Sequence, residues 1–267
     1  MKIGEVEQQA DDVLSAYEVR TAPVDVLAMA KAEGIELAEG DYAEPFCGRI
    51  EYHRDVGSFV LFHPRLETAR NLGRARFSVA HELGHYFLEH HRAMLMTGRS
   101  HNSTSDFICD DVLEREADGF AAALLIPSFA LRQRLARRRF MTLHEVLALA
   151  QEWQSSATSA TIRYARFTSE ACGVVVSQDG IVQFYSPSDE AKALGFGFLR
   201  KGTPVPSRSK TFDAGKPDVA NDVREGTGNT EDWFPERQFH RELWEETFPL
   251  GGTGMVLTLL ALKTGSD

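Results

Sequence analysis

The sequence of 267 residues has few cysteines and no long apolar run. Its three cysteines, Cys47, Cys109 and Cys172, are widely separated and form no Cys-x-x-Cys pair, so neither a disulfide scaffold nor a cysteine-built zinc site is expected. The longest apolar stretches, residues 120–126 and 255–262, fall well short of the roughly 20 residues of a membrane-spanning helix. The sequence therefore predicts no membrane role.

An excess of basic charge is also absent. The chain carries 29 Lys and Arg residues against 39 Asp and Glu residues, a formal net charge of −10, which argues against a protein whose main role is to bind nucleic acid. The first residues, MKIGEVEQQADD, lack the basic end and the apolar core of a secretory signal. With 43% hydrophobic and 25% charged residues, the composition is typical of a globular protein. We therefore expect a cytoplasmic location.

Apolar residues recur with a helical period through the first two thirds of the chain. This pattern predicts helices at residues 6–19, 23–33, 72–91, 111–125, 128–139, 142–153 and 157–167, with a strand at 57–64 and a loop at 92–110. The last two helices, joined by a short turn, have the length of a helix-turn-helix unit. The first part of the chain is therefore expected to be mostly helical, with a small sheet.

The character of the sequence changes near residue 168. Two β-branched runs flank Gln178-Asp179-Gly180, a pattern typical of a β-hairpin. Residues 201–232 predict a long loop, 240–248 a packed helix and 254–263 a buried strand. The expected fold class is α+β in three segments: a first domain at residues 1–127, a helical helix-turn-helix-like extension at 128–168, and a smaller α/β domain at 169–267.

The motif His81-Glu82-Leu83-Gly84-His85 carries the clearest chemical signal. On a helix of about 100° per residue, Glu82 lies near 100° from His81 and His85 near 40°, so the three polar side chains share one face. Two imidazoles one turn apart can bind the same divalent ion, and the glutamate between them can reach a water molecule on that ion. The motif predicts a metal-activated hydrolase. The alternative is a chance spacing on a solvated helix face.

A catalytic zinc site needs a third protein ligand, and the segment EREADGFAAALLIP at residues 114–127 offers one. Glu114 and Asp118 share a helix face, and the apolar run behind them would anchor that helix in the core. If Glu114 binds the ion, Asp118 can accept the free N–H of a ligating histidine. Glu116, rotated by about 200° from Glu114, is the competing ligand. A solvated acidic helix face is the alternative for the whole group.

Together these motifs resemble the ImmA/IrrE family of metallopeptidases. The resemblance rests on RFSVAHELGH at residues 76–85, on the segment at 114–127 and on SATSATIRY at 156–164, and it covers about residues 20–167. It implies that His81, His85 and Glu114 hold the metal and that Glu82 is the general base. It also implies a gluzincin-like helix–loop–helix core, in which the position of Asp118 is often asparagine.

The resemblance further implies a function. Members of this family cleave a helix-turn-helix transcriptional repressor at a specific site, which relieves repression under stress or during induction of a mobile element. The metal is expected to be zinc, and manganese or iron could be held by the same two histidines and carboxylate. Residues 171–262 resemble the GAF-like sensor domain of the radiation-response branch. The main hypothesis is therefore a cytosolic metallopeptidase with a C-terminal regulatory part.

Two other functions compete with this hypothesis. The same fold could sequester a repressor without hydrolysing it, as a binding protein in a two-gene regulatory module. Direct DNA binding through residues 128–167 is the third possibility, but the second helix of that segment carries only Arg163 and Arg166, few for phosphate contacts. DNA is therefore not the expected partner.

Several neighbouring residues have a role that the motif does not settle. His101, Tyr86 and Arg76 are candidates for the donor that stabilises the developing oxyanion. His90 and His91 are interpreted as helix-end cations. Gly84 either lets another element approach its helix or is a plain packing glycine. The strand at residues 59–62 either presents an edge to an extended substrate or only completes the sheet.

Overall fold

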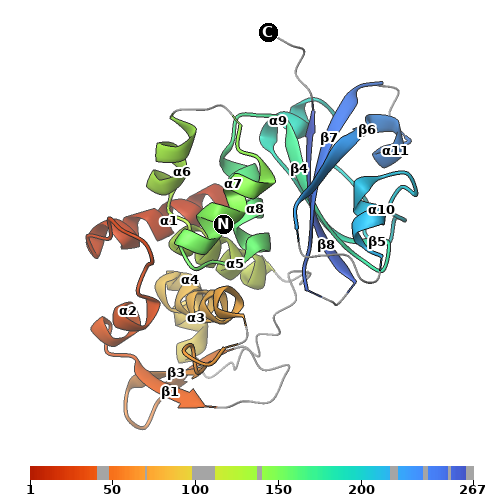
Figure 1. Ribbon diagram of the computed structural model, residues 1–267. Helices are drawn as coiled ribbons and strands as arrows, with labels where there is room; N and C mark the ends of the chain where they lie inside the picture. The colour runs from red at the N-terminus through yellow and green to blue at the C-terminus, as the bar shows by residue number, and fades with distance from the viewer. Residues whose placement is uncertain are drawn as a thin grey trace. The chain divides into compact units, whose positions relative to one another are not determined.

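The computed structural model describes residues 1–40, 48–69, 71–97, 112–136, 140–216, 222–236, 240–251 and 254–262. The chain divides into two compact units, Met1–Ala130 with Leu149–Ala157, and Leu131–Ala148 with Thr158–Asp267. Within the described ranges, no helix is both long and apolar enough to cross a membrane. The fold class is α+β, with a helical N-terminal region that contains a small mixed sheet and a five-stranded antiparallel sheet towards the C-terminus (Figure 1).

The first part of the chain is mostly helical, as the periodicity predicts. Its helices are α1 (Ile3–Ala16), α2 (Val26–Ala32), α3 (Leu72–Phe87), α4 (Glu89–Met96), α5 (Val112–Leu125), α6 (Ser128–Leu135), α7 (Leu143–Glu152) and α8 (Ala157–Phe167). Helix α5 packs against both α1 and α3 in the first unit. Its apolar run is buried from Gly119 to Leu125, which anchors the helix in the core and fixes the direction of its polar first turns.

The small sheet contains β1 (Glu36–Gly40), β2 (Arg49–His53) and β3 (Ser58–Pro64) in the order β1-β3-β2. Strand β3 pairs in parallel with β1 and antiparallel with β2. Helix α3 packs against β2 and β3. Because β3 has a partner on each side, residues 59–62 offer no edge to a substrate, and of the two alternatives the strand that completes the sheet is the correct one. The outer strands are β1 and β2.

The helix predicted at residues 72–91 is interrupted at Leu88. Helix α3 ends at Phe87, Leu88 has an extended backbone (φ −74°, ψ 109°), and α4 begins at Glu89. Part of the loop predicted at 92–110 is instead helical up to Met96. A helical wheel that starts at His81 is therefore valid only as far as Phe87. The histidines that follow do not lie where that wheel places them.

The C-terminal sheet contains β4 (Cys172–Gln178), β5 (Ile181–Pro187), β6 (Arg224–Asn229), β7 (Glu242–Pro249) and β8 (Met255–Leu262), in the order β5-β4-β8-β7-β6. The predicted hairpin is confirmed as the β4–β5 pair, and its turn has positive φ at both Asp179 (50°) and Gly180 (75°). Such a turn matches the right-handed twist of the two strands. The buried strand predicted at 254–263 is confirmed as β8.

Two predictions in this region are wrong. The segment predicted as a packed helix at residues 240–248 forms β7, which pairs with both β6 and β8. As a central strand it is buried on both faces for much of its length, so it lacks the alternation that marks a half-buried strand. The loop expected at 201–232 contains regular elements: α10 (Lys210–Ala214), β6 and α11 (Thr230–Trp233). A further short helix, α9 (Asp189–Ala193), follows β5.

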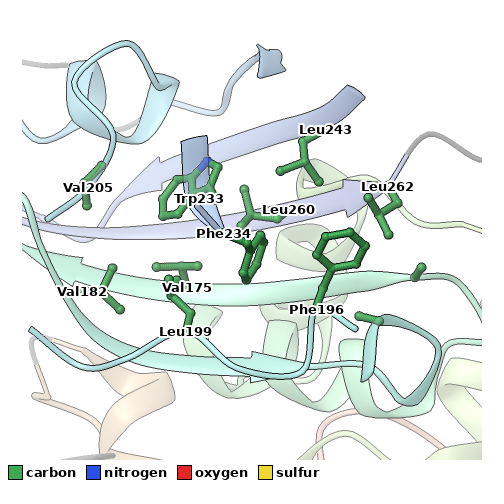
Figure 2. Packing of buried hydrophobic residues seen from close by; sticks show 12 residues of the cluster. Val175, Val182, Phe196, Leu199, Val205, Trp233, Phe234, Leu243, Leu260 and Leu262 are labelled. Carbon is green, nitrogen blue, oxygen red and sulfur yellow. The ribbon is translucent and has the colours of Figure 1, made fainter. Parts of the chain in front are cut away.

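The second unit has its own apolar core on one face of the sheet. It is built from Ala171, Val175, Val182, Ala191, Phe196, Leu199, Val205, Trp233, Phe234, Leu243, Leu260 and Leu262 (Figure 2). A buried carboxylate, Glu245, accepts hydrogen bonds from Nε1 of Trp233 (2.7 Å) and from the backbone N–H of Lys210 (2.8 Å). Both oxygens of this carboxylate and the N–H of Trp233 are therefore paired, which limits the cost of their burial.

Candidate metal centre

Three donor side chains converge between α3 and α5. His81 and His85 lie one turn apart on α3, and Glu114 lies in the first turn of α5. The Nε2 atoms of the two histidines are 3.1 Å apart. Nε2 of His81 lies 3.2 Å from Oε2 of Glu114, and Nε2 of His85 lies 3.4 Å from Oε1. All three residues are buried, so the structure brings together the three residues that the motif and the resemblance single out.

The two helices that carry these donors are held close together at Gly84. A Cβ atom there would lie 3.2 Å from both Cα and the carbonyl oxygen of Ala117 on α5. Near the end of α3, the ring of Phe87 stacks on that of Phe120, with 5.8 Å between the centroids. Of the two roles considered for Gly84, close approach of another element is therefore the correct one, and this approach places Glu114 within reach of the histidines.

The geometry of the three donors fits a divalent ion. In a tetrahedral zinc site with bonds of about 2.0–2.1 Å, neighbouring ligand atoms lie about 3.3 Å apart. The observed separations of 3.1, 3.2 and 3.4 Å are close to this value. Burial alone would lower the pKa of His81, but its hydrogen bonds to Asp118 and Glu114 raise that pKa well above 6.5. The cluster therefore favours a positive charge at its centre, which a metal ion can supply in place of a proton.

Asp118 lies on the far side of His81 from the cluster. Its Oδ1 atom is 2.9 Å from Nδ1 of His81, while Nε2 of the same ring faces Glu114. An N–H at Nδ1 that donates to Asp118 leaves the lone pair of Nε2 directed at the centre of the cluster. This is the arrangement in which His81 can act as a ligand.

Glu82 is the most deeply buried acid near the cluster, with 1% of its surface exposed. Its Oε2 atom accepts the backbone N–H of Ile50 on β2 at 2.9 Å. Its Oε1 atom has no hydrogen-bond partner among the described residues. A buried carboxylate oxygen without a partner is costly and is characteristic of functional sites. The chain reaches β2 through Gly48, where a Cβ atom would lie only 3.3 Å from Cγ of Glu82.

A second group of side chains adjoins His85. Nδ1 of His85 lies 3.0 Å from Nδ1 of His91, and Nε2 of His91 lies 3.0 Å from Oε2 of Glu116. The same oxygen lies 2.6 Å from Nε2 of His90, and the other oxygen of Glu116 binds the amino group of Met1. Glu116 therefore faces this second group, whereas Glu114 faces the first.

The interpretation of His91 as a helix-end cation is wrong. Its ring is 2% exposed, and burial lowers its pKa to about 4, so it is neutral near pH 7. The helix break at Leu88 turns His91 back towards His85, and neither glycine nor proline marks this break in the sequence. Burial alone would raise the pKa of Glu116, but hydrogen bonds from Met1, His91 and His90 hold it at about 2.

The two described candidates for an oxyanion donor, Tyr86 and Arg76, are engaged elsewhere. The hydroxyl of Tyr86 donates to Oε2 of Glu33 at 3.0 Å. Arg76 is buried, and its guanidinium donates to the carbonyl oxygens of Gln154, at 3.1 Å, and Val24. His101 lies outside the described residues. The contacts of Tyr86 and Arg76 support a structural role for both.

Comparison with known proteins agrees with this site. Residues 61–164 match the Peptidase_M78 family, described as the IrrE N-terminal-like domain. No curated protein matches the chain by sequence. A Mycobacterium tuberculosis transcriptional regulator has a similar structure, with a TM-score of 0.66 and 14% identity over 97% of this chain and 76% of that one. At this identity the likeness concerns the fold alone. Residues 61–164 of this chain thus match the IrrE N-terminal-like (Peptidase_M78) domain, and His81, His85 and Glu114 within this range are a candidate metal site.

Proposed function

We propose that the protein is a metal-dependent endopeptidase that cleaves a helix-turn-helix transcriptional repressor at a specific site and so relieves repression. The convergence of His81, His85 and Glu114 on one point carries this proposal. The Peptidase_M78 match supports hydrolysis of a protein substrate. The structural likeness to a transcriptional regulator supports a role in gene regulation. Such a repressor acts on DNA, so the reaction would take place in the cytoplasm.

In this proposal the two histidines and Glu114 hold a single ion, and Asp118 fixes the ring of His81. Zinc is the expected metal because a catalytic zinc site uses three protein ligands of this kind, and manganese or iron can be held by the same donors. The ion supplies Lewis-acid polarisation of the scissile carbonyl and of the attacking water. The remaining steps depend on the side chains around it.

Glu82 is the proposed general base. The N–H of Ile50 holds Oε2, so the carboxylate has one fixed and one available oxygen. Oε1 would accept the proton of the attacking water and deliver it to the leaving amine. Because burial keeps bulk water away from Glu82, the proton would stay between the carboxylate and the reacting atoms.

Strand β2 is the proposed docking edge for the substrate. It is an outer strand, and the N–H of Ile50 is directed at Glu82 rather than at β3. Among the described strands, the edge of β2 that has no strand partner therefore runs past the general base. An extended peptide that pairs with this edge would bring its backbone to the proposed metal site, the mode of recognition known as β-strand addition.

Residues 169–267 are proposed to form a regulatory, GAF-like sensor domain, after the first domain at 1–127 and the helical extension at 128–168. The support is the five-stranded antiparallel sheet with its own apolar core. A DNA-binding role for the extension has little support, because Arg163 on α8 is 1% exposed and does not present its charge to a phosphate.

The proposal is tested with the helix-turn-helix repressor encoded nearest to this gene. The repressor is incubated with the zinc-loaded protein or with its Glu82→Gln variant, and intact masses are measured. Two complementary fragments from the unaltered protein alone would support the proposal and identify the bond. An uncut repressor that co-purifies with both forms would contradict hydrolysis and favour sequestration by binding.

A further inference from the structure

Three buried side chains form a continuous hydrogen-bonded chain behind the candidate metal site. His85 is 1% exposed, His91 2% and Glu116 3%. The chain runs from Nδ1 of His85 to Nδ1 of His91 over 3.0 Å, and from Nε2 of His91 to Oε2 of Glu116 over 3.0 Å. It draws on α3, α4 and α5 and approaches His85 from the side opposite to the donor atom Nε2.

The positions of the protons in this chain depend on one another. Two ring nitrogens 3.0 Å apart share a single proton, so one donates and the other accepts. If Nε2 of a neutral His85 offers its lone pair to a metal, the proton of that ring is on Nδ1 and His91 accepts it. A neutral His91 then carries its own proton on Nε2, where the carboxylate of Glu116 accepts it.

The opposite order of protons would disable the ligand. If Nδ1 of His91 donated, Nδ1 of His85 would accept, and the proton of His85 would be on Nε2. That proton would face Nε2 of His81, only 3.1 Å away, and would occupy the lone pair that a metal needs. The carboxylate of Glu116 accepts hydrogen bonds but does not donate them. It therefore keeps the proton of His91 on Nε2 and that of His85 on Nδ1, which leaves Nε2 of His85 able to bind a metal.

We propose that His91 and Glu116 are positioning residues that fix the ring orientation and the tautomer of His85 for metal binding. This inference rests on the proposed function, because it assigns a partner to one of the proposed ligands. Asp118 is the corresponding partner of His81. A carboxylate then orients each histidine of the motif. Asp118 bonds His81 directly, and Glu116 acts on His85 through His91.

A second metal ion at His90, His91 and Glu116 is the competing explanation, because their donor atoms also lie within 4.8 Å of one another. The tautomers of His91 and His85 disfavour a metal ion there. A metal on Nε2 of His91 would move the proton of that ring to Nδ1, and the proton of His85 would then be forced onto its own Nε2. The separation of 2.6 Å between His90 Nε2 and Glu116 Oε2 suits a direct hydrogen bond.

The test compares zinc affinities of the full chain by competition with a chromophoric chelator. His91→Phe keeps a ring of similar size but removes the acceptor, and we expect zinc binding about 10–100-fold weaker. His91→Asn can place its amide oxygen near the position of Nδ1 and should stay within about threefold of the unaltered protein. His90→Ala is the matched control, because His90 binds the same carboxylate oxygen, and its zinc affinity should be nearly unchanged.

Thermal unfolding in the presence of chelator shows whether each variant folds. If His91→Phe binds zinc as well as the unaltered protein, or if His91→Asn loses as much affinity as His91→Phe, the positioning role is overturned. Two zinc ions per chain, with one lost in both His90→Ala and His91→Phe, would establish the second metal site instead. Should His91→Phe not fold, His91→Leu takes its place, because it also removes the acceptor for the N–H of His85. Zinc affinity of His91→Leu equal to that of the unaltered protein would overturn the positioning role, and a loss that His91→Asn does not share would support it.

These outcomes are separate from those that test the proposed function. A protein that binds one zinc and cleaves the repressor, with His91→Phe unaffected in zinc affinity, would refute the positioning role and leave the peptidase intact. A protein that binds zinc with the expected order of affinities but cuts no repressor would support the positioning role and remove the proposed substrate.

Discussion

The backbone N–H of Ile50 donates a hydrogen bond of 2.9 Å to Oε2 of Glu82. This bond joins strand β2 to helix α3 at the proposed general base, and it leaves Oε1 of the carboxylate without a partner among the described residues. The strand that would dock the substrate is thus the one that orients the base, so a displacement of β2 would affect both functions.

Replacing Glu82 with glutamine should abolish proton transfer and preserve the site. The amide oxygen of glutamine can still accept the N–H of Ile50, but the side chain cannot take a proton from water. We expect cleavage to fall by about 10²–10⁴-fold and zinc affinity to stay nearly constant. Fragment formation followed by mass spectrometry, with zinc content as the control, measures this. Cleavage at the original rate would remove Glu82 from the mechanism.

Substitutions of Asp118 should separate hydrogen bonding from charge. Asp118→Ala removes the acceptor 2.9 Å from Nδ1 of His81, and zinc affinity should fall by about 10–100-fold. Asp118→Asn keeps an oxygen that can accept the same N–H, so its loss should be much smaller. Chelator competition on both variants checks this order. Equal losses would show that the negative charge of Asp118, rather than its hydrogen bond, supports the ligand.

Gly84→Ala should disturb the metal site through packing. The added Cβ would lie 3.2 Å from backbone atoms of Ala117, so α3 and α5 would have to separate slightly. We expect a loss of about 1–3 kcal/mol in the free energy of unfolding and weaker zinc binding, because the ligands lie on both helices. Gly4→Ala is the control, since its Cβ would meet nothing within 4 Å. Unaltered zinc affinity and stability in Gly84→Ala would contradict the proposed role of this close approach.

Glu246 should make the stability of the second unit depend on pH. Burial is the largest cause that raises the pKa of this carboxyl from 4.5 to about 7. The N–H of Leu143 lowers this pKa, and the negative charges of Glu225 and Glu145 raise it. The folded state therefore binds more protons than the unfolded state between these two pH values. The free energy of unfolding should fall as pH rises from about 4.5 to about 7 and level off above that.

Glu246→Gln should remove this dependence, because glutamine is neutral and can still accept the N–H of Leu143. The variant should match the unaltered protein near pH 4.5 and exceed it above pH 7 by on the order of 2 kcal/mol. Denaturant unfolding across this range, with Glu242→Gln on the exposed start of β7 as the control, checks the prediction. A constant difference at all pH values would show that the carboxyl of Glu246 titrates normally.

Features determined by local geometry were predicted correctly from the sequence. Helix α8 has the predicted bounds, and the hairpin at Asp179 and Gly180 follows from turn residues that tolerate positive φ. His81 and His85 face the same point because residues four apart on a helix always lie one turn apart. The helix face shared with Asp118 and the family resemblance favoured Glu114, and Glu116 remained the competing ligand.

Features determined by distant contacts were not predictable. Strand β7 resembled an amphipathic helix because both of its faces are buried for much of its length, so its sequence lacks the alternation of a half-buried strand. The pairing of β2 with β3 and the bond from Ile50 to Glu82 join segments with no local signal for each other. No local sequence signal predicts the break at Leu88 either. Because of this break, His91 is a buried neutral ring and not the helix-end cation that was expected.

The sequence by itself determined the spacing of the donor residues and the chemistry available to them, because helical periodicity and side-chain type are local properties. Only the tertiary structure decided which acid faces the histidines, which oxygen of Glu82 is fixed, and which group stands behind His85. Glu114 and Glu116 are two residues apart on the same helix, yet they face different histidines. The packing of α5 against α3, together with the hydrogen bonds between Glu116 and the two histidines of α4, makes that distinction.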